Sequence, residues 1–168
     1  SNGVATFVNN TGGTFSLSGF STATGTTTNY YGTFVDTTNK PILSANTPQA
    51  WTYNTTEISN GIFIQDGSKI KVSNSGIYEI GYSAQIVKTS PGNKQDVTIW
   101  ARINGNNVDR SSSTLSLDNQ NSYQLPFVSY IFELNANDYV EFYFSAPAAD
   151  VAIQTLRSEE HTSELQSQ

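Results

Sequence analysis

The chain contains no cysteine, no methionine and a single histidine. Without cysteine there is no disulfide bond, no thiol nucleophile and no cysteine-ligated metal. Charged residues make up only 13% of the sequence, the net charge is −6, and like charges never gather in a run. We therefore expect no binding to a nucleic-acid backbone. No apolar stretch approaches the roughly 20 residues of a membrane-spanning helix, so we expect no membrane insertion either.

What the chain has in quantity is small polar and aromatic side chains. Serine, threonine and asparagine together account for 58 of 168 residues, and aromatic residues for 12%. Disordered chains are usually charge-rich and poor in aromatics, so this composition predicts a folded protein. Hydroxyl, amide and aromatic side chains favour strands and turns over helices. The length suits about one domain.

The last twelve residues, 157–168, break from the composition of the rest. They read RSEEHTSELQSQ and hold the single histidine, His161, with three of the fourteen acids. This string matches the translation of an adapter used in short-read DNA sequencing, which indicates an environmental sequence assembly as the source. We expect it to be an artefact outside the fold. Residues 1–156 then have a charge of 7 − 11 = −4 and no histidine, which excludes Ser-His-Asp and Cys-His catalysis and histidine-ligated metal.

Residues 1–29 are rich in glycine and threonine, which indicates a linker or fibre stalk. From Tyr30 onward, short alternating apolar segments follow one another between turn residues, and none has a sustained helical period. About nine such strands predict an all-β antiparallel sandwich. The clearest expected strands are 62–64 with 69–72 as a hairpin around Asp66-Gly67, 77–88, 96–103 turning at Asn104-Gly105 into 108–114, and 122–134 with 138–145.

Several segments resemble a known family in the same order along the chain. They are YYGTFVDTT at 30–38, GIYEIGYSAQIVKT at 76–89, VTIWARINGNNV at 97–108 and FELNANDYVEFYF at 132–144. Together they resemble the jelly-roll domains of the tumour necrosis factor and complement globular-head group. More narrowly, they are similar to such domains at the ends of bacteriophage and environmental viral structural proteins. The resemblance covers about 30–156 and implies a two-sheet antiparallel jelly-roll head domain.

The resemblance also implies one strand more than the sequence offers. The family ends with an apolar strand in the inner sheet, between the first strand and the one corresponding to 77–88. Here residues 151–156 only approach that strand, and the adapter-like tail offers Leu165 as its sole aliphatic residue. We expect a domain that lacks its last strand and has unpaired strand edges.

In the family the inner sheet of each subunit packs around a threefold axis, which implies a homotrimer here. Tyr78, Ile80, Tyr82, Val128, Tyr130 and Phe132 should then face the core. The opposite faces should contact neighbouring subunits through Gly81, Ser83, Gln85, Phe127, Ser129 and Ile131. Phe127 and Ile131 are the strongest candidates, because large exposed apolar side chains favour a partner surface. The alternative is that a loop or the N-terminal segment covers them.

Four residues are candidates for ligand contact: Trp100, Arg102, Asn104 and Asn106. Trp100 could stack on a sugar ring, and Arg102 could bind carboxylates. The alternative is a Trp100 buried between sheet and loop. The turns 90–95, 104–107 and 111–121 are loop tips, where binding residues often lie.

No residue pattern indicates a catalytic, cofactor-binding or metal-binding site. Scattered aspartates could supply calcium oxygens, but no EF-hand spacing occurs, so we expect solvated turn residues. Glu79, Glu133 and Glu141 stand singly in expected strands and form no glycosidase-like pair. No phosphate-binding loop or dinucleotide fingerprint is present. The sequence therefore predicts a protein that is not an enzyme.

The function expected from these observations is a trimeric head of a viral (phage) fibre or structural protein. It would attach to a host-surface glycan or protein through loop contacts multiplied by threefold presentation, and it would lie on the virion surface or outside cells. Two alternatives remain: a bacterial surface or spore-coat head of the same fold, and a secreted carbohydrate-binding module.

Overall fold

The computed structural model describes residues 2–8, 14–21 and 29–155, the first two ranges by their backbone alone. The expected artefact at 157–168 lies outside the described residues. Within the segment expected to be a linker or stalk, β1 (Asn2–Val8) and β2 (Thr14–Ser21) pair antiparallel. No helix in the described part of the chain is long and apolar enough to cross a membrane.

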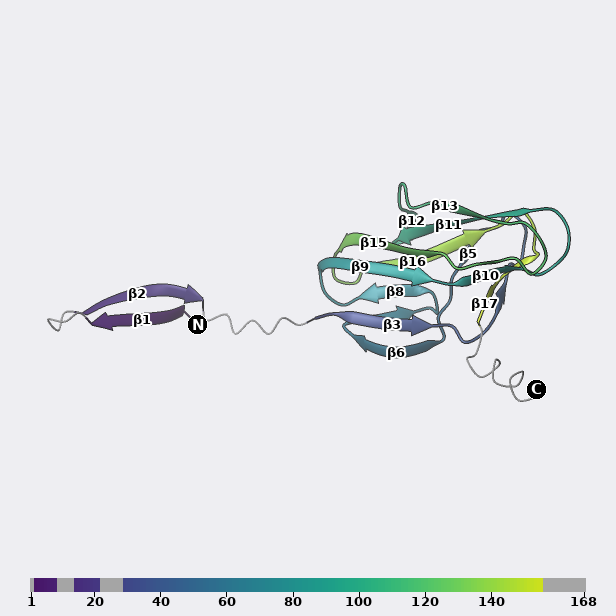
Figure 1. Cartoon of the computed structure of the whole chain (residues 1–168). Coiled ribbons are helices and arrows are strands. Elements are labelled where there is room, and N and C mark those ends of the chain that lie inside the picture. Colours follow the sequence, from purple (N-terminus) through teal and green to yellow (C-terminus); the bar gives the residue numbers. More distant parts are fainter. Residues whose placement is uncertain (1, 9–13, 22–28, 156–168) are drawn as a thin grey trace, which may run out of the picture.

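The remaining strands form two layers of antiparallel pairs (Figure 1). One layer is an antiparallel sheet. Its strands, in spatial order, are β7 (Ile62–Gln65), β8 (Lys69–Val72), β16 (Tyr139–Ser145), β11 (Gln95–Ile103) and β13 (Ser113–Leu117), with the short β5 (Gln49–Ala50) and β12 (Asn106–Asn107) at its margins. The other layer contains β9 (Gly76–Ser83) with β15 (Phe127–Leu134), β3 (Tyr31–Val35) with β6 (Thr55–Asn60), and the group β14 (Tyr123–Gln124), β10 (Gln85–Lys88), β17 (Val151–Gln154) and β4 (Lys40–Pro41). The predicted all-β antiparallel sandwich is confirmed.

Side-chain alternation along the strands builds the core between the layers, as expected for strands with one buried face. All six side chains predicted to face the core lie in it or against it: Tyr78, Ile80, Tyr82 and Phe132 are buried, and Val128 and Tyr130 are half-buried. Aromatic rings join the layers, since Tyr82 of β9 lies 4.6 Å from Phe142 of β16 between ring centroids. Trp51 packs edge-on against Tyr82 at 4.4 Å.

The nearly unbroken apolar sequence of β16 predicts burial on both faces, but only the inward face is fully buried, and Tyr139, Tyr143 and Ser145 on the other face are half-buried. Val140, Phe142 and Phe144 are fully buried. Glu141 is also buried, and its Oε1 accepts a 2.6 Å hydrogen bond from the Ser68 hydroxyl. That bond reduces the cost of burying this carboxyl group, which lies opposite Arg102 on the outer face of the sheet.

The structure corrects several local expectations. The predicted strand 122–134 is two strands, β14 and β15, separated at residues 125–126. The predicted strand 108–114 is wrong in its bounds: residues 108–112 form a loop, in which the Ser111 hydroxyl bonds the backbone of Ala101 and Val108, and the strand β13 begins at Ser113. The predicted strand 77–88 is two strands, β9 and β10, separated at Ala84. β6 was missed, because all six of its side chains are exposed and give no apolar alternation.

The β7–β8 hairpin turns at Asp66 and Gly67, which have φ angles of 53° and 77°. We predict that Gly67→Ala destabilises the domain by about 1 kcal/mol, because the left-handed conformation disfavours a Cβ. Steric crowding does not contribute, since no atom lies within 4 Å of the added Cβ. Denaturant unfolding measures the change.

Gly76→Ala is the matched control. Gly76 has no positive φ, and its added Cβ would meet the Tyr78 ring at an ordinary 3.5 Å. Its stability should be unchanged or slightly higher. Equal losses for the two variants would contradict the conformational explanation.

Candidate functional site

The outward face of the β9–β15 pair carries large apolar side chains. Phe127 and Ile131 on β15 are 74% and 75% exposed, and Ile77 on β9 is 77% exposed. Opposite residues of an antiparallel pair share a face, and the register sets Ile131 opposite Glu79. The Glu79 carboxylate accepts a 2.7 Å hydrogen bond from the Ser129 hydroxyl. No residue within 29–155 covers Phe127 or Ile131. The alternative that a loop shields these two side chains from solvent is therefore wrong for loops of that range.

The other residues expected on this face divide between two strands. Gly81 and Ser83 are exposed on β9, opposite Ser129 and Phe127. Gln85 lies beyond the break at Ala84 on β10, where it is half-buried and its amide donates to Gln154 at 3.2 Å. Gln85 therefore stands apart from the exposed face, and the role of the set in a trimer stays a prediction.

Two apolar members of the exposed face were missed from the sequence. Ile77 precedes the buried alternation of β9 and is out of phase with it, which is the signal that could have identified it. Leu125, 68% exposed, precedes β15 and follows the short β14. We call Ile77, Leu125, Phe127 and Ile131 the apolar face.

A second candidate surface lies on the outside of the other sheet, where Trp100 and Arg102 of β11 meet Tyr143 of β16. Trp100 lies directly opposite Tyr143 in the ladder, with ring centroids 5.9 Å apart and near-parallel planes. The Arg102 guanidinium carbon lies 3.9 Å from the Tyr143 ring centroid. Asn107 Oδ1 accepts hydrogen bonds from Trp100 Nε1 at 3.0 Å and from Arg102 Nε at 2.8 Å.

These contacts hold the aromatic–arginine cluster, defined as Trp100, Arg102, Asn107 and Tyr143, in one arrangement. The Trp100 side chain is half-buried, so its ring is neither fully exposed nor fully buried. The terminal guanidinium nitrogens of Arg102 have no hydrogen-bond acceptor in the described part of the chain. A preorganised arginine beside aromatic rings suits planar or anionic groups. Tyr143 was missed because its strand was predicted to be buried on both faces.

The two asparagines of the adjacent turn differ in their contacts. Asn104, with φ 51°, donates to Asp138 Oδ1 at 2.8 Å and accepts from the Tyr139 backbone N–H at 3.1 Å. Its side chain therefore joins two turns of the fold. Asn106 is exposed, and its amide contacts only the Asn104 carbonyl at 3.4 Å among described residues.

The aspartates considered as calcium ligands make bonds within turns and strands. Asp36 accepts from the hydroxyls of Thr38 and Thr52, each at 2.6 Å, and Asp96 accepts from Ser116 at 2.6 Å. Across residues 29–155, no three acidic or histidine side chains gather as metal ligands would.

Comparison with known proteins finds similar chains among solved structures. No family model matches the chain, and no curated protein matches it. Among solved structures, the crystal structure of murine APRIL at pH 8.5 is similar, with 12% sequence identity, a TM-score of 0.44, and coverage of 69% of this chain and 87% of that one.

Hydrogen bonds from the Asn104 side chain and the Asn135 backbone hold the pKa of Asp138 below its ordinary value of 3.8. Ionised Asp138 thus stabilises the fold fully above that value, and this contribution is lost as pH falls through the lower folded pKa. We predict that Asp138→Asn flattens the decline of melting temperature between pH 4 and pH 2, measured by calorimetry. The control is Asp118→Asn, at an exposed loop position. An unchanged acid slope for Asp138→Asn would contradict the prediction.

Proposed function

We propose that this chain is a non-enzymatic head domain that assembles as a homotrimer and attaches to a surface. The observation that carries the proposal is the apolar face, which consists of three large side chains on β9 and β15 and of Leu125 just before β15, each more than two-thirds exposed. Large apolar side chains exposed on one face of a protein favour a partner surface. The occupant we assign is the same face of two further copies of the chain.

The chemistry of the face suits burial in an interface. Its central carboxylate, Glu79, is already hydrogen-bonded to Ser129, so association would not leave that group without a partner. Gly81 adds no side chain between the apolar residues, which lets another backbone approach closely. Threefold rather than twofold symmetry is what the resemblance to tumour necrosis factor and complement head domains implies.

The aromatic–arginine cluster supports the attachment role. Its residues lie on β11, β12 and β16, whereas the apolar face lies on β9, on β15 and just before β15, in the opposite layer of the sandwich. Assembly through one layer would leave the cluster on the other layer exposed. Three copies presented together would convert weak contacts to a glycan or protein into useful avidity.

We place this head on a phage fibre or another virion-surface protein, following the narrower sequence resemblance. The alternatives are a bacterial surface or spore-coat head and a secreted carbohydrate-binding module. Neighbouring genes discriminate among them, because capsid and tail genes favour the viral role and an adjacent glycoside hydrolase gene favours the module.

The trimer is tested by Phe127→Ser combined with Ile131→Ser. Each large apolar side chain contributes about 1.5–3 kcal/mol when it is buried, so the double variant should sediment as a monomer where the unmodified chain sediments as a trimer. Circular dichroism should show an unchanged fold, because both residues lie outside the core. Sedimentation velocity over a concentration series makes the measurement.

Leu43→Ser is the matched control for that experiment. Leu43 is 81% exposed and equally apolar, but it lies in the loop after β4. It should leave the trimer intact. A monomeric unmodified chain at every concentration would defeat the assembly proposal.

Attachment is tested on a glycan array and on cells with Arg102→Lys. Lysine keeps the charge but not the planar group stacked on Tyr143, so we expect binding about tenfold weaker, near 1.4 kcal/mol. Arg110→Lys, in the exposed loop after β12, should bind like the unmodified chain. Binding unaffected by Arg102→Lys would exclude the cluster, and binding undiminished in the monomeric variant would favour an autonomous carbohydrate module.

A further inference from the structure

The outer face of the β7–β8–β16–β11 sheet carries basic and aromatic side chains beyond the aromatic–arginine cluster. Lys71 of β8 lies opposite Tyr139 of β16 on one side and opposite Phe63 of β7 on the other. Its Nζ lies 6.0 Å from the Phe63 ring centroid, and Lys69 Nζ lies 5.0 Å from that of Tyr139. Phe63 is 42% exposed, and the other three side chains are half-buried. We call Phe63, Lys69, Lys71 and Tyr139 the lysine–aromatic cluster.

The two clusters lie on the same side of the sheet and some distance apart. Tyr139 and Tyr143 are separated by four positions on β16, and an even separation places two side chains on one face. At about 3.3 Å per residue, their Cα atoms are about 13 Å apart, which is more than the width of one sugar ring. The buried Glu141 lies between them and is hydrogen-bonded to Ser68. A ligand that contacts both clusters must therefore be an extended chain.

The cations of this face outnumber its acids. Lys69 pairs with Asp66 at 2.8 Å, and Glu141 lies opposite Arg102. Lys71 Nζ forms neither an ion pair nor a hydrogen bond in the described part of the chain. These five residues carry 3 − 2 = +1, whereas the rest of the described sandwich carries 4 − 9 = −5. A local excess of positive charge on an acidic domain favours an anionic ligand at this face.

The side chains of the face suit an acidic sugar chain. Half-exposed aromatic rings offer an apolar surface to a sugar ring, with a polar group at the ring edge. The guanidinium fork of Arg102 matches the two oxygens of a carboxylate, and a lysine ammonium binds the same group as a point charge. The negative charge of the domain opposes a nucleic acid, which carries a phosphate on every nucleotide.

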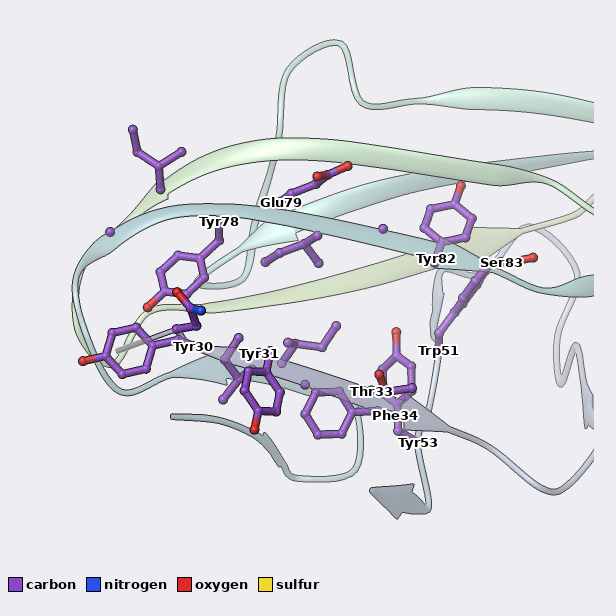
Figure 2. A pocket seen from close by; sticks show the side chains of 18 residues that line it. Tyr30, Tyr31, Thr33, Phe34, Trp51, Tyr53, Tyr78, Glu79, Tyr82 and Ser83 are labelled. Atoms are coloured by element: carbon purple, nitrogen blue, oxygen red, sulfur yellow. The ribbon is translucent and has the colours of Figure 1, made fainter. Parts of the chain in front are cut away.

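The cleft between β3 and β9 is less suitable for such a ligand. It has a volume of about 780 Å³ and borders the opposite layer, where Tyr78, Tyr82 and Trp51 line it (Figure 2). Its lining in the described part of the chain includes no lysine or arginine, and its one charged residue there is Glu79. An acidic chain would meet repulsion in the cleft without a compensating cation.

We infer that the two clusters form one binding face for an acidic glycan, an extended chain of sugar rings that carry carboxylates. One ring packs against Trp100, and its carboxylate binds the terminal guanidinium nitrogens of Arg102. A ring further along the chain packs against Phe63, and its carboxylate binds Lys71. The inference rests on the proposed attachment role and names the ligand class of that role. A short oligomer reaches a single head, so its affinity does not depend on trimer formation.

The test is isothermal titration calorimetry of the full chain with oligogalacturonate, which carries a carboxylate on each ring. Lys71→Gln should bind it about tenfold more weakly, because a charge-assisted contact is lost. The fold should be unaffected, since Lys71 lies on the outer face of the sheet. The matched control is Lys40→Gln, which removes the same charge from β4 in the opposite layer. It should bind like the unmodified chain, and an oligomer whose carboxylates are reduced to alcohols should bind at least tenfold more weakly.

The outcomes separate this inference from the attachment role. Full affinity in Lys71→Gln, together with weakened binding in Arg102→Lys, would overturn the extended face and leave attachment through the aromatic–arginine cluster standing. Preference for dextran sulfate would overturn the carboxylate assignment, and preference for a polyglutamate peptide would overturn the glycan assignment. Attachment to cells without oligogalacturonate binding would overturn the ligand class alone, whereas loss of both would overturn the attachment role as well.

Discussion

The contact on which the rest of the structure depends is the aromatic bridge between the two layers. Trp51 lies against Tyr82, and Tyr82 lies against Phe142, at 4.4 Å and 4.6 Å between ring centroids. These rings fix how far apart the layers lie and which face of β9 points inward. Once Tyr82 faces the core, the strand period of two requires Gly81 and Ser83 to face outward. The residues of β9 that face the core thus determine which of its residues form the outer surface.

The sequence predicted the strands whose side chains alternate between apolar and polar. It failed where a strand exists through its pairing with another strand, or where a side chain bonds a distant backbone group. Tyr78, Ile80 and Tyr82 could be assigned to the core because a polar or small residue lies between each of them and the next, which is the pattern of a strand with one buried face. β6 could not be predicted, since the residues of Thr55–Asn60 are all exposed and the strand exists through its pairing with β3. The loop after β12 likewise depends on Ser111, whose hydroxyl bonds to the backbone ten residues away cannot be inferred from composition.

The candidate sites show the same division. Phe127 and Ile131 were identifiable because they are out of phase with buried neighbours on an alternating strand. The aromatic–arginine cluster was identified only in part, because Tyr143 reaches Trp100 through a ladder between β11 and β16, which are distant in the sequence. Asn104 was expected at a ligand-contact tip, yet its side chain ties the turn to Asp138 and Tyr139. Residue type indicates chemical capacity, and long-range pairing decides where that capacity is used.

β9 is the element in which these constraints meet, because it presents three surfaces at once. Its inward side chains pack under the aromatic bridge, its outward face carries Ile77, and residues 76–83 line a cleft of about 780 Å³ shared with β3. A shift of β9 by one residue would exchange its two faces, because side chains alternate along a strand with a period of two. Such a shift would move Tyr78, Ile80 and Tyr82 out of the core and would bring Glu79 into it. The core, the apolar face and the cleft therefore depend together on the phase of one strand.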